Sequence, residues 1–220
     1  MILRQLQQLI GGIYDVSVTH DVYDFLVTNR QALPRAARDS VSDEELIVAE
    51  EADAYGVSLY LDPALLERLG QSNPMERLTH ENVADYWTAL EGVSHFLYFA
   101  WNAGHDKPVT LLELELQAEI DKYVASYLLL KRQFPERFPE ELLHVLFERT
   151  RIDSRLANGR EHLYRAATRH AEKFCRRLAQ SLRQSLHESS PTMHEPVLAE
   201  LRRFYRLTDA RKVAHIERTA

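Results

Sequence analysis

Glutamate and histidine residues recur at helical spacing in the central part of this sequence. Glu91 and His95 are four residues apart, and so are Glu115 and Glu119. Residues with this spacing share one face of a helix, so each pair would present two metal-ligating groups side by side. His170 falls on the apolar stripe that we predict for a later helix. Carboxylate and imidazole groups that point inward from several helices bind iron or manganese in bundle proteins, so these five residues are candidate metal ligands.

The same residues also have a purely structural interpretation. Glu-x-x-His, the usual signature of such bundles, occurs once, at residues 141–144, on the water side of its predicted helix. Glu91 and His95 lie about 90–130° from the centre of their helix's apolar stripe. Lys122 is close enough along the chain to pair with Glu119. We therefore expect solvated, ion-paired side chains and no cofactor, with a divalent metal as the alternative.

A second pattern is the segment Arg165-Ala-Ala-Thr-Arg-His170, which lies in a predicted helix. An arginine followed by four to six residues and a histidine resembles the motif of HEPN-type ribonucleases. The resemblance covers these few residues, and Ala166 stands where that family often has a polar residue. It implies that Arg165 stabilises phosphate charge and that His170 helps to activate the ribose 2′-OH.

The basic residues are concentrated in the last third of the chain. Residues 151–220 contain 15 Lys and Arg against 8 Asp and Glu, whereas the whole chain has a net charge of −6. Such a basic segment either packs on the acidic body of the protein or binds an external anion, such as nucleic acid. Arginine favours bidentate contacts with carboxylate or phosphate. The candidate anion-binding or partner-binding residues are Arg155, Arg160, Arg165, Arg169, Arg176 and Arg177.

Several classes of chemistry have no sequence signal. The chain lacks Gly-x-Ser-x-Gly, a glycine-rich phosphate loop and a dinucleotide fingerprint. Its single cysteine, Cys175, excludes an internal disulfide framework and a multi-cysteine zinc site, and its place beside a core stripe predicts an inert thiol. No apolar run is long enough for a signal peptide or a membrane span. We therefore expect a cytoplasmic protein that does not bind membranes.

The clearest predicted helix runs from Thr110 to Leu130. Thr110 followed three residues later by Glu113 is a capping-box signature. Glu119 sits on the flank of the apolar stripe. The stripe falls within one arc of about 80° and contains Leu112, Leu116, Ile120, Tyr123, Tyr127 and Leu130.

The N-terminal part mixes helix and strand signals. Residues 45–61 contain two β-rich runs joined by residues 52–56, which predicts a hairpin with Gly56 supplying the positive φ of the turn. Asp62-Pro63 then predicts a helix start, with the aspartate as the cap. Residues 13–28 fit either a strand or a helix, and whether the hairpin pairs with the segment around Val16 stays open. We predict a predominantly helical α+β protein, with a small α+β unit at 1–72 and a bundle of about five helices at 73–220.

Three functions remain after these exclusions. The first is a non-catalytic regulatory or adaptor protein that acts through protein partners or self-association. The second is a nucleic-acid-binding helical protein, including a HEPN-like ribonuclease that uses Arg165 and His170. The third is a metal-binding bundle. The first is our leading interpretation, because no catalytic motif is evident.

Overall fold

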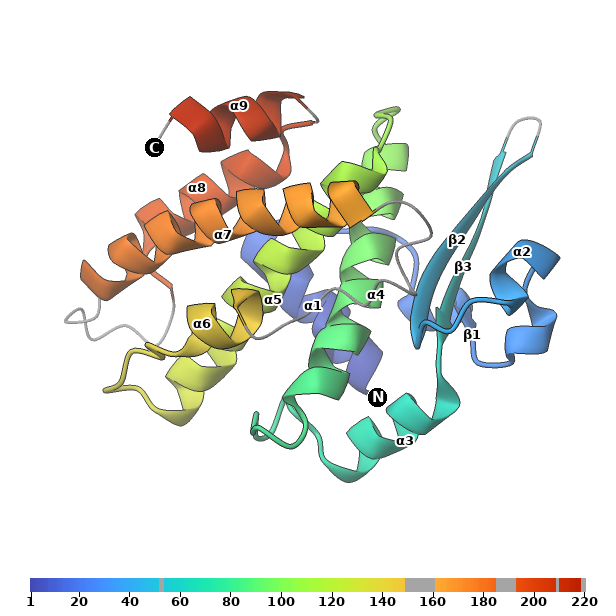
Figure 1. Cartoon of the computed structure of the whole chain (residues 1–220), viewed down its shortest axis with the longest axis horizontal. Coiled ribbons are helices and arrows are strands. Elements are labelled where there is room, and N and C mark those ends of the chain that lie inside the picture. Colours follow the sequence, from blue (N-terminus) through green and yellow to red (C-terminus); the bar gives the residue numbers. More distant parts are fainter. Residues whose placement is uncertain (52–53, 149–160, 185–192, 209, 219–220) are drawn as a thin grey trace.

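The computed structural model describes residues 1–51, 54–148, 161–184, 193–208 and 210–218. The described chain is mostly helical with one small sheet, which confirms the predicted α+β fold class (Figure 1). The elements, with η for a 3-10 turn, are α1 (Ile2–Tyr14), η1 (Val22–Asp24), β1 (Leu26–Val27), η2 (Arg30–Ala32), α2 (Arg35–Arg38), β2 (Glu44–Glu51), β3 (Ala54–Leu61), α3 (Pro63–Gln71), α4 (Val83–Ala103), α5 (Leu111–Gln133), α6 (Leu142–Phe147), α7 (Glu161–Gln184), α8 (Glu195–Tyr205) and α9 (Ala210–Arg218).

The sheet consists of the predicted hairpin and one short additional strand. β2 and β3 pair antiparallel, with Glu44 opposite Leu61 and Val48 opposite Val57. β1 pairs parallel to β3, and the strand order is β1–β3–β2. The third strand therefore comes from the end of the ambiguous segment 13–28. β2 and β3 both contact α4, so the sheet lies against the bundle through that helix (Figure 1).

Two predicted helix starts are confirmed in atomic detail. The Asp62 carboxylate accepts a hydrogen bond of 2.8 Å from the backbone N–H of Ala64, which caps α3. Thr110 Oγ1 accepts from the backbone N–H of Glu113 at 3.3 Å, and the Glu113 carboxylate accepts from the backbone N–H of Thr110 at 2.9 Å. Caps of this kind each stabilise a helix by about 1 kcal/mol.

α5 runs through the centre of the bundle, with α4 on one side and α7 on the other (Figure 1). Its predicted apolar stripe is buried, as at Leu116 and Ile120. The sides of α5 outside this stripe are also buried, at Glu115, Asp121 and Lys122. Because neighbouring elements cover α5 on several sides, these polar groups must satisfy one another inside the protein.

α1 connects the N-terminal unit to the helices that follow. It packs against α4, α5 and α8, and buries Leu3, Leu6 and Ile10. At its end, the Tyr14 hydroxyl donates a hydrogen bond of 2.5 Å to the Asp121 carboxylate on α5. Residues 1–72 and 73–220 therefore share one continuous hydrophobic cluster.

The C-terminal part contains α7, α8 and α9. α7 packs on α5, and α9 lies at the edge of the molecule next to α7 and α8 (Figure 1). The sequence also predicts that the arginine-rich helix begins around Ser154, and this start lies outside the described residues. None of the described helices is long and apolar enough to cross a bilayer.

Candidate functional site

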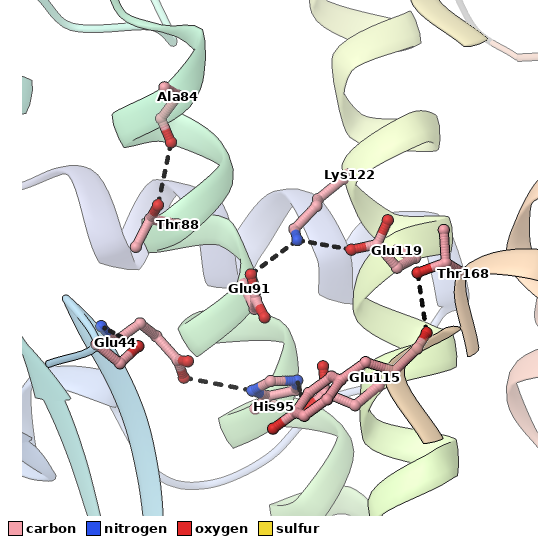
Figure 2. A network of polar contacts seen from close by, with 11 residues as sticks. Glu44, Ala84, Thr88, Glu91, His95, Glu115, Glu119, Lys122 and Thr168 are labelled. Carbon is pink, nitrogen blue, oxygen red and sulfur yellow. Dashed lines mark hydrogen bonds and ion pairs between the residues drawn. The ribbon is translucent and has the colours of Figure 1, made fainter. Parts of the chain in front are cut away.

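The structure gathers a set of ionisable side chains at the contact between β2, α4 and α5 (Figure 2). Four of the five candidate ligands belong to it. We call the whole set the acidic cluster: Glu44 from β2, Glu91 and His95 from α4, and Glu115, Glu119 and Lys122 from α5.

A glycine allows β2 to approach α4 at this point. A Cβ atom at Gly92 would lie 2.9 Å from Glu44 Cγ and 2.9 Å from Leu59 Cδ1, closer than such atoms approach in proteins. Glycine therefore leaves the space into which Glu44 extends from the first position of β2. The same close approach places Glu44 beside Glu91 and His95, one residue before and three residues after Gly92.

Lys122 occupies one end of the acidic cluster, between two carboxylates (Figure 2). Its Nζ lies 2.7 Å from Glu91 Oε2 and 2.8 Å from Glu119 Oε1. Both carboxylates raise the pKa of Lys122, although burial opposes them. Lys122 is therefore a fixed cation at this end.

His95 occupies the other end of the acidic cluster, again between two carboxylates. Its Nδ1 lies 3.3 Å from Glu44 Oε1, and its Nε2 lies 3.9 Å from Glu115 Oε1. Nε2 is buried and makes no hydrogen bond to any residue in the described part of the chain. The Nδ1 atom of the imidazole therefore points toward Glu44, and its Nε2 atom points toward Glu115 without a hydrogen bond.

Burial and excess negative charge perturb the acid–base properties of this end. Burial raises the pKa of Glu115 to about 8 and raises that of Glu44, in spite of the opposing attraction of His95. Burial alone would lower the pKa of His95, but Glu44 and Glu115 raise it to about 9. At neutral pH these shifts keep His95 protonated and favour a proton on Glu115, so a metal ion that binds here displaces protons.

A divalent cation can balance the negative charge of the carboxylates in the acidic cluster. It contains four carboxylates against one lysine and one histidine. Ligand atoms of Glu44, Glu91 and His95 all lie within 4.8 Å of one another. Tetrahedral donors around an ion with bonds of about 2.1 Å lie about 3.4 Å apart, so the three ligand atoms would have to approach one another by up to about 1.4 Å.

The ligand chemistry indicates which ions fit. Two carboxylates and one imidazole suit manganese, iron or zinc, because these ions accept mixed oxygen and nitrogen ligands. Metal-binding histidines usually donate their second ring N–H to a carboxylate. Glu115, which faces His95 Nε2, is placed for that supporting contact.

Comparisons with protein-family models, curated proteins and solved structures found no match.

The expectation that Glu91 and His95 lie on a solvated flank of their helix is wrong for the histidine. His95 is only 5% exposed, because β2 covers that side of α4. Glu44 was missed in the sequence, since it lies 51 residues before His95 and follows no shared periodicity. Gly92 is the signal that was available, because glycine in the middle of a helix often marks a close approach of other chain segments. The predicted pairing of Lys122 with Glu119 is confirmed.

His170 and Arg165 lie elsewhere on α7. His170 Nδ1 is 3.5 Å from a carboxylate oxygen of Glu217 on α9. Arg165 is exposed and lies 3.5 Å from Glu161 one turn earlier. Five residues of helix separate the two candidates by about 140° around the axis, so they project from different sides of α7.

The remaining candidate residues are distributed along α7. Arg169 is exposed, Arg176 pairs with Glu172 at 2.6 Å, and Arg177 donates to the backbone carbonyl of Ile216 at 2.7 Å. Cys175 is fully buried, and burial raises the pKa of its thiol well above the usual range. Arg155 and Arg160 lie outside the described residues.

Proposed function

We propose that this protein is a non-catalytic regulatory protein whose interior binds one divalent transition-metal ion and whose surface contacts a protein partner. Glu44, Glu91 and His95 are the proposed ligands. The observation that supports the metal site is the convergence of their ligand atoms within 4.8 Å.

The surroundings of the acidic cluster favour regulation over catalysis. One surface cavity is lined by α1 and residues 15–21, and another by the ends of α7 and α8. Neither cavity is lined by a residue of the acidic cluster. A metal at this position would instead hold the hairpin strand β2 to α4, and so control how firmly the sheet packs on the bundle.

Titration of the full-length, chelator-treated protein with Mn²⁺ and Zn²⁺ in a calorimeter tests this proposal. We expect one ion per chain. The variants Glu44→Gln and His95→Gln should weaken binding at least tenfold, since each removes a ligand. His144→Gln is the matched control, because His144 is an exposed histidine that pairs with Glu148.

Thermal unfolding gives a second measurement of the same proposal. Free ion at one hundred times its dissociation constant stabilises the folded state by about 2.7 kcal/mol. For a chain of this length, the Tm should rise by about 5–10 °C. The absence of stoichiometric binding, or equal binding by the wild type and His95→Gln, contradicts the proposal.

Nucleic-acid binding through α7 is a second candidate function, and a specific feature favours it. At 100° per residue, Arg165, Arg169, Arg176 and Arg183 fall within an arc of about 40°. Arg165, Arg176 and Arg183 have side chains more than half exposed, and Arg169 is also exposed. Their ion pairs with glutamates are surface pairs worth less than about 1 kcal/mol each, so phosphate groups can replace them.

Fluorescence anisotropy with a single-stranded RNA at several salt concentrations tests this second candidate. Four phosphate contacts predict a slope of about −3 in log K against log salt. The double variant Arg165→Glu/Arg169→Glu should reduce affinity more than tenfold at low salt. Arg68→Glu, which breaks an exposed pair with Asp85, is the control. Affinity that is unchanged in the double variant excludes this function.

A further inference from the structure

A second buried lysine lies apart from the acidic cluster, near the C-terminus. Lys212 of α9 is fully buried, although lysine is among the residues least often found in that state. Its Nζ donates a hydrogen bond of 2.6 Å to Gln117 Oε1 on α5. Gln117 Nε2 in turn donates to the Asp121 carboxylate at 2.8 Å. The ammonium is therefore held by the polar interior of α5.

Aromatic rings complete the surroundings of this ammonium. Lys212 Nζ lies 4.6 Å from the ring centroid of Tyr98, 4.6 Å from that of Phe204 and 5.8 Å from that of Tyr205. Cations within about 6 Å of ring faces are attracted by the ring quadrupole, and several rings around one ammonium form an aromatic cage. Burial lowers the pKa of Lys212 to about 7, against the attraction of Asp121 and Glu113.

The cage and its cation come from different parts of the chain. Tyr98 belongs to α4, Gln117 and Asp121 to α5, and Phe204 and Tyr205 to α8. Only the ammonium comes from α9. We propose that these five residues form a binding site for a primary amino group, and that Lys212 is its built-in ligand. An external primary amino group, on a free amine or on a lysine of another protein, takes the same position when α9 leaves it.

The contacts of α9 indicate that it can leave. Its buried residues in the described chain are Lys212, His215 and Ile216, of which only Ile216 is aliphatic. α9 also makes polar contacts: His215 Nε2 is 2.5 Å from Glu200 Oε1, and Lys173 Nζ is 2.5 Å from Glu217 Oε2. Elements that bury few apolar side chains open locally at low free-energy cost. α9 also lies at the periphery of the molecule (Figure 1).

The first experiment removes the built-in ligand from the full-length chain. Lys212→Ala leaves the cage without its ammonium, and the probes are n-butylammonium and Nα-acetyl-lysine amide. We expect n-butylammonium to bind this variant and to raise its Tm, and to bind at least tenfold more tightly than the neutral probe n-butanol. Lys212→Met, which fills the same space with an apolar side chain, should bind neither amine.

The two amines also separate the two sources of ligand. Binding of both amines supports a site that accepts a lysine side chain from another protein. Binding of n-butylammonium alone supports a site for small free amines. Failure of both amines to bind folded Lys212→Ala, or equal binding of n-butanol, overturns the proposal.

A second experiment uses the wild-type protein and does not depend on the folding of a variant. Hydrogen exchange of the α9 amides is followed with increasing n-butylammonium, against sodium chloride at the same ionic strength. A ligand that binds only the undocked form raises the undocked population about elevenfold at ten times its dissociation constant. Lys212 is tethered to the protein, and tethered groups have effective concentrations in the millimolar range. The n-butylammonium concentration is therefore raised to about 100 mM. α9 exchange that stays unchanged over this range overturns the proposal.

Discussion

Replacing Lys212 with methionine should change how the stability of the protein depends on pH. Burial lowers the pKa of this lysine from its usual 10.5 to about 7, while Asp121 and Glu113 face it and oppose the shift. Between pH 7 and pH 10.5, the folded protein therefore binds fewer protons at this position than the unfolded chain. Unfolding takes up a proton in that range, so the free energy of unfolding rises with pH.

The size of the effect follows from the same pKa. At about 1.4 kcal/mol for each pH unit, the contribution of Lys212 changes by roughly 5 kcal/mol between pH 7 and pH 10.5. Methionine fills a similar volume with a flexible apolar chain and does not titrate. The difference in unfolding free energy between the wild type and Lys212→Met should therefore grow with pH in favour of the wild type.

Urea unfolding followed by circular dichroism, at several pH values between 7 and 9.5, measures this difference. Subtracting the variant from the wild type cancels the titration of groups that the two proteins share. Lys131→Met is the control, because the Lys131 side chain lies in another part of the fold and donates to the backbone carbonyl of Pro135. Stability curves for the wild type and Lys212→Met that run parallel across this range refute the reasoning.

Three further substitutions test other parts of the structure. Gly92→Ala should lower the free energy of unfolding by about 1–3 kcal/mol through overpacking, and it should lower metal affinity by displacing Glu44. Gly70→Ala is the control, because its Cβ meets nothing within 4 Å. Equal urea midpoints for the two variants count against this packing. Lys122→Met should cost about 3–5 kcal/mol, because it leaves two carboxylates without their buried cation; a loss below 1 kcal/mol in urea unfolding shows that the pairs are solvated. Thr110→Ala should lower stability by about 1 kcal/mol through loss of the α5 cap, and a urea midpoint equal to that of the wild type is inconsistent with the capping box.

The sequence predicted the elements whose signals are local. The capping box of Thr110 and Glu113 fixes the start of α5, and the hairpin forms over the predicted residues. The place of Gly56 in the turn is wrong, because Gly56 lies within β3 opposite Ala49. The cap and the hairpin both depend on residues a few positions apart, which is the range over which helix caps and turns act. The fold class followed from these elements.

The buried polar groups of the acidic cluster and the burial of Lys212 could not be predicted from local sequence signals. The acidic cluster depends on β2 packing against α4, a tertiary contact that periodicity within either element does not encode. Periodicity placed His95 on a water-facing flank, since it cannot show that a strand covers that flank. The burial of Lys212 was equally hidden, because a lysine in a basic tail gives no sign that aromatic rings from two other helices surround it.

The contact between Glu44 and His95 closes a loop of 51 residues. A bond across such a loop removes many conformations from the unfolded chain, which is how cross-links strengthen small folds. The only cysteine of this chain is buried in α7, so no disulfide can provide that cross-link. An ion coordinated by both side chains would act as a reversible cross-link, and the concentration of that ion would determine how firmly the N-terminal sheet packs against α4.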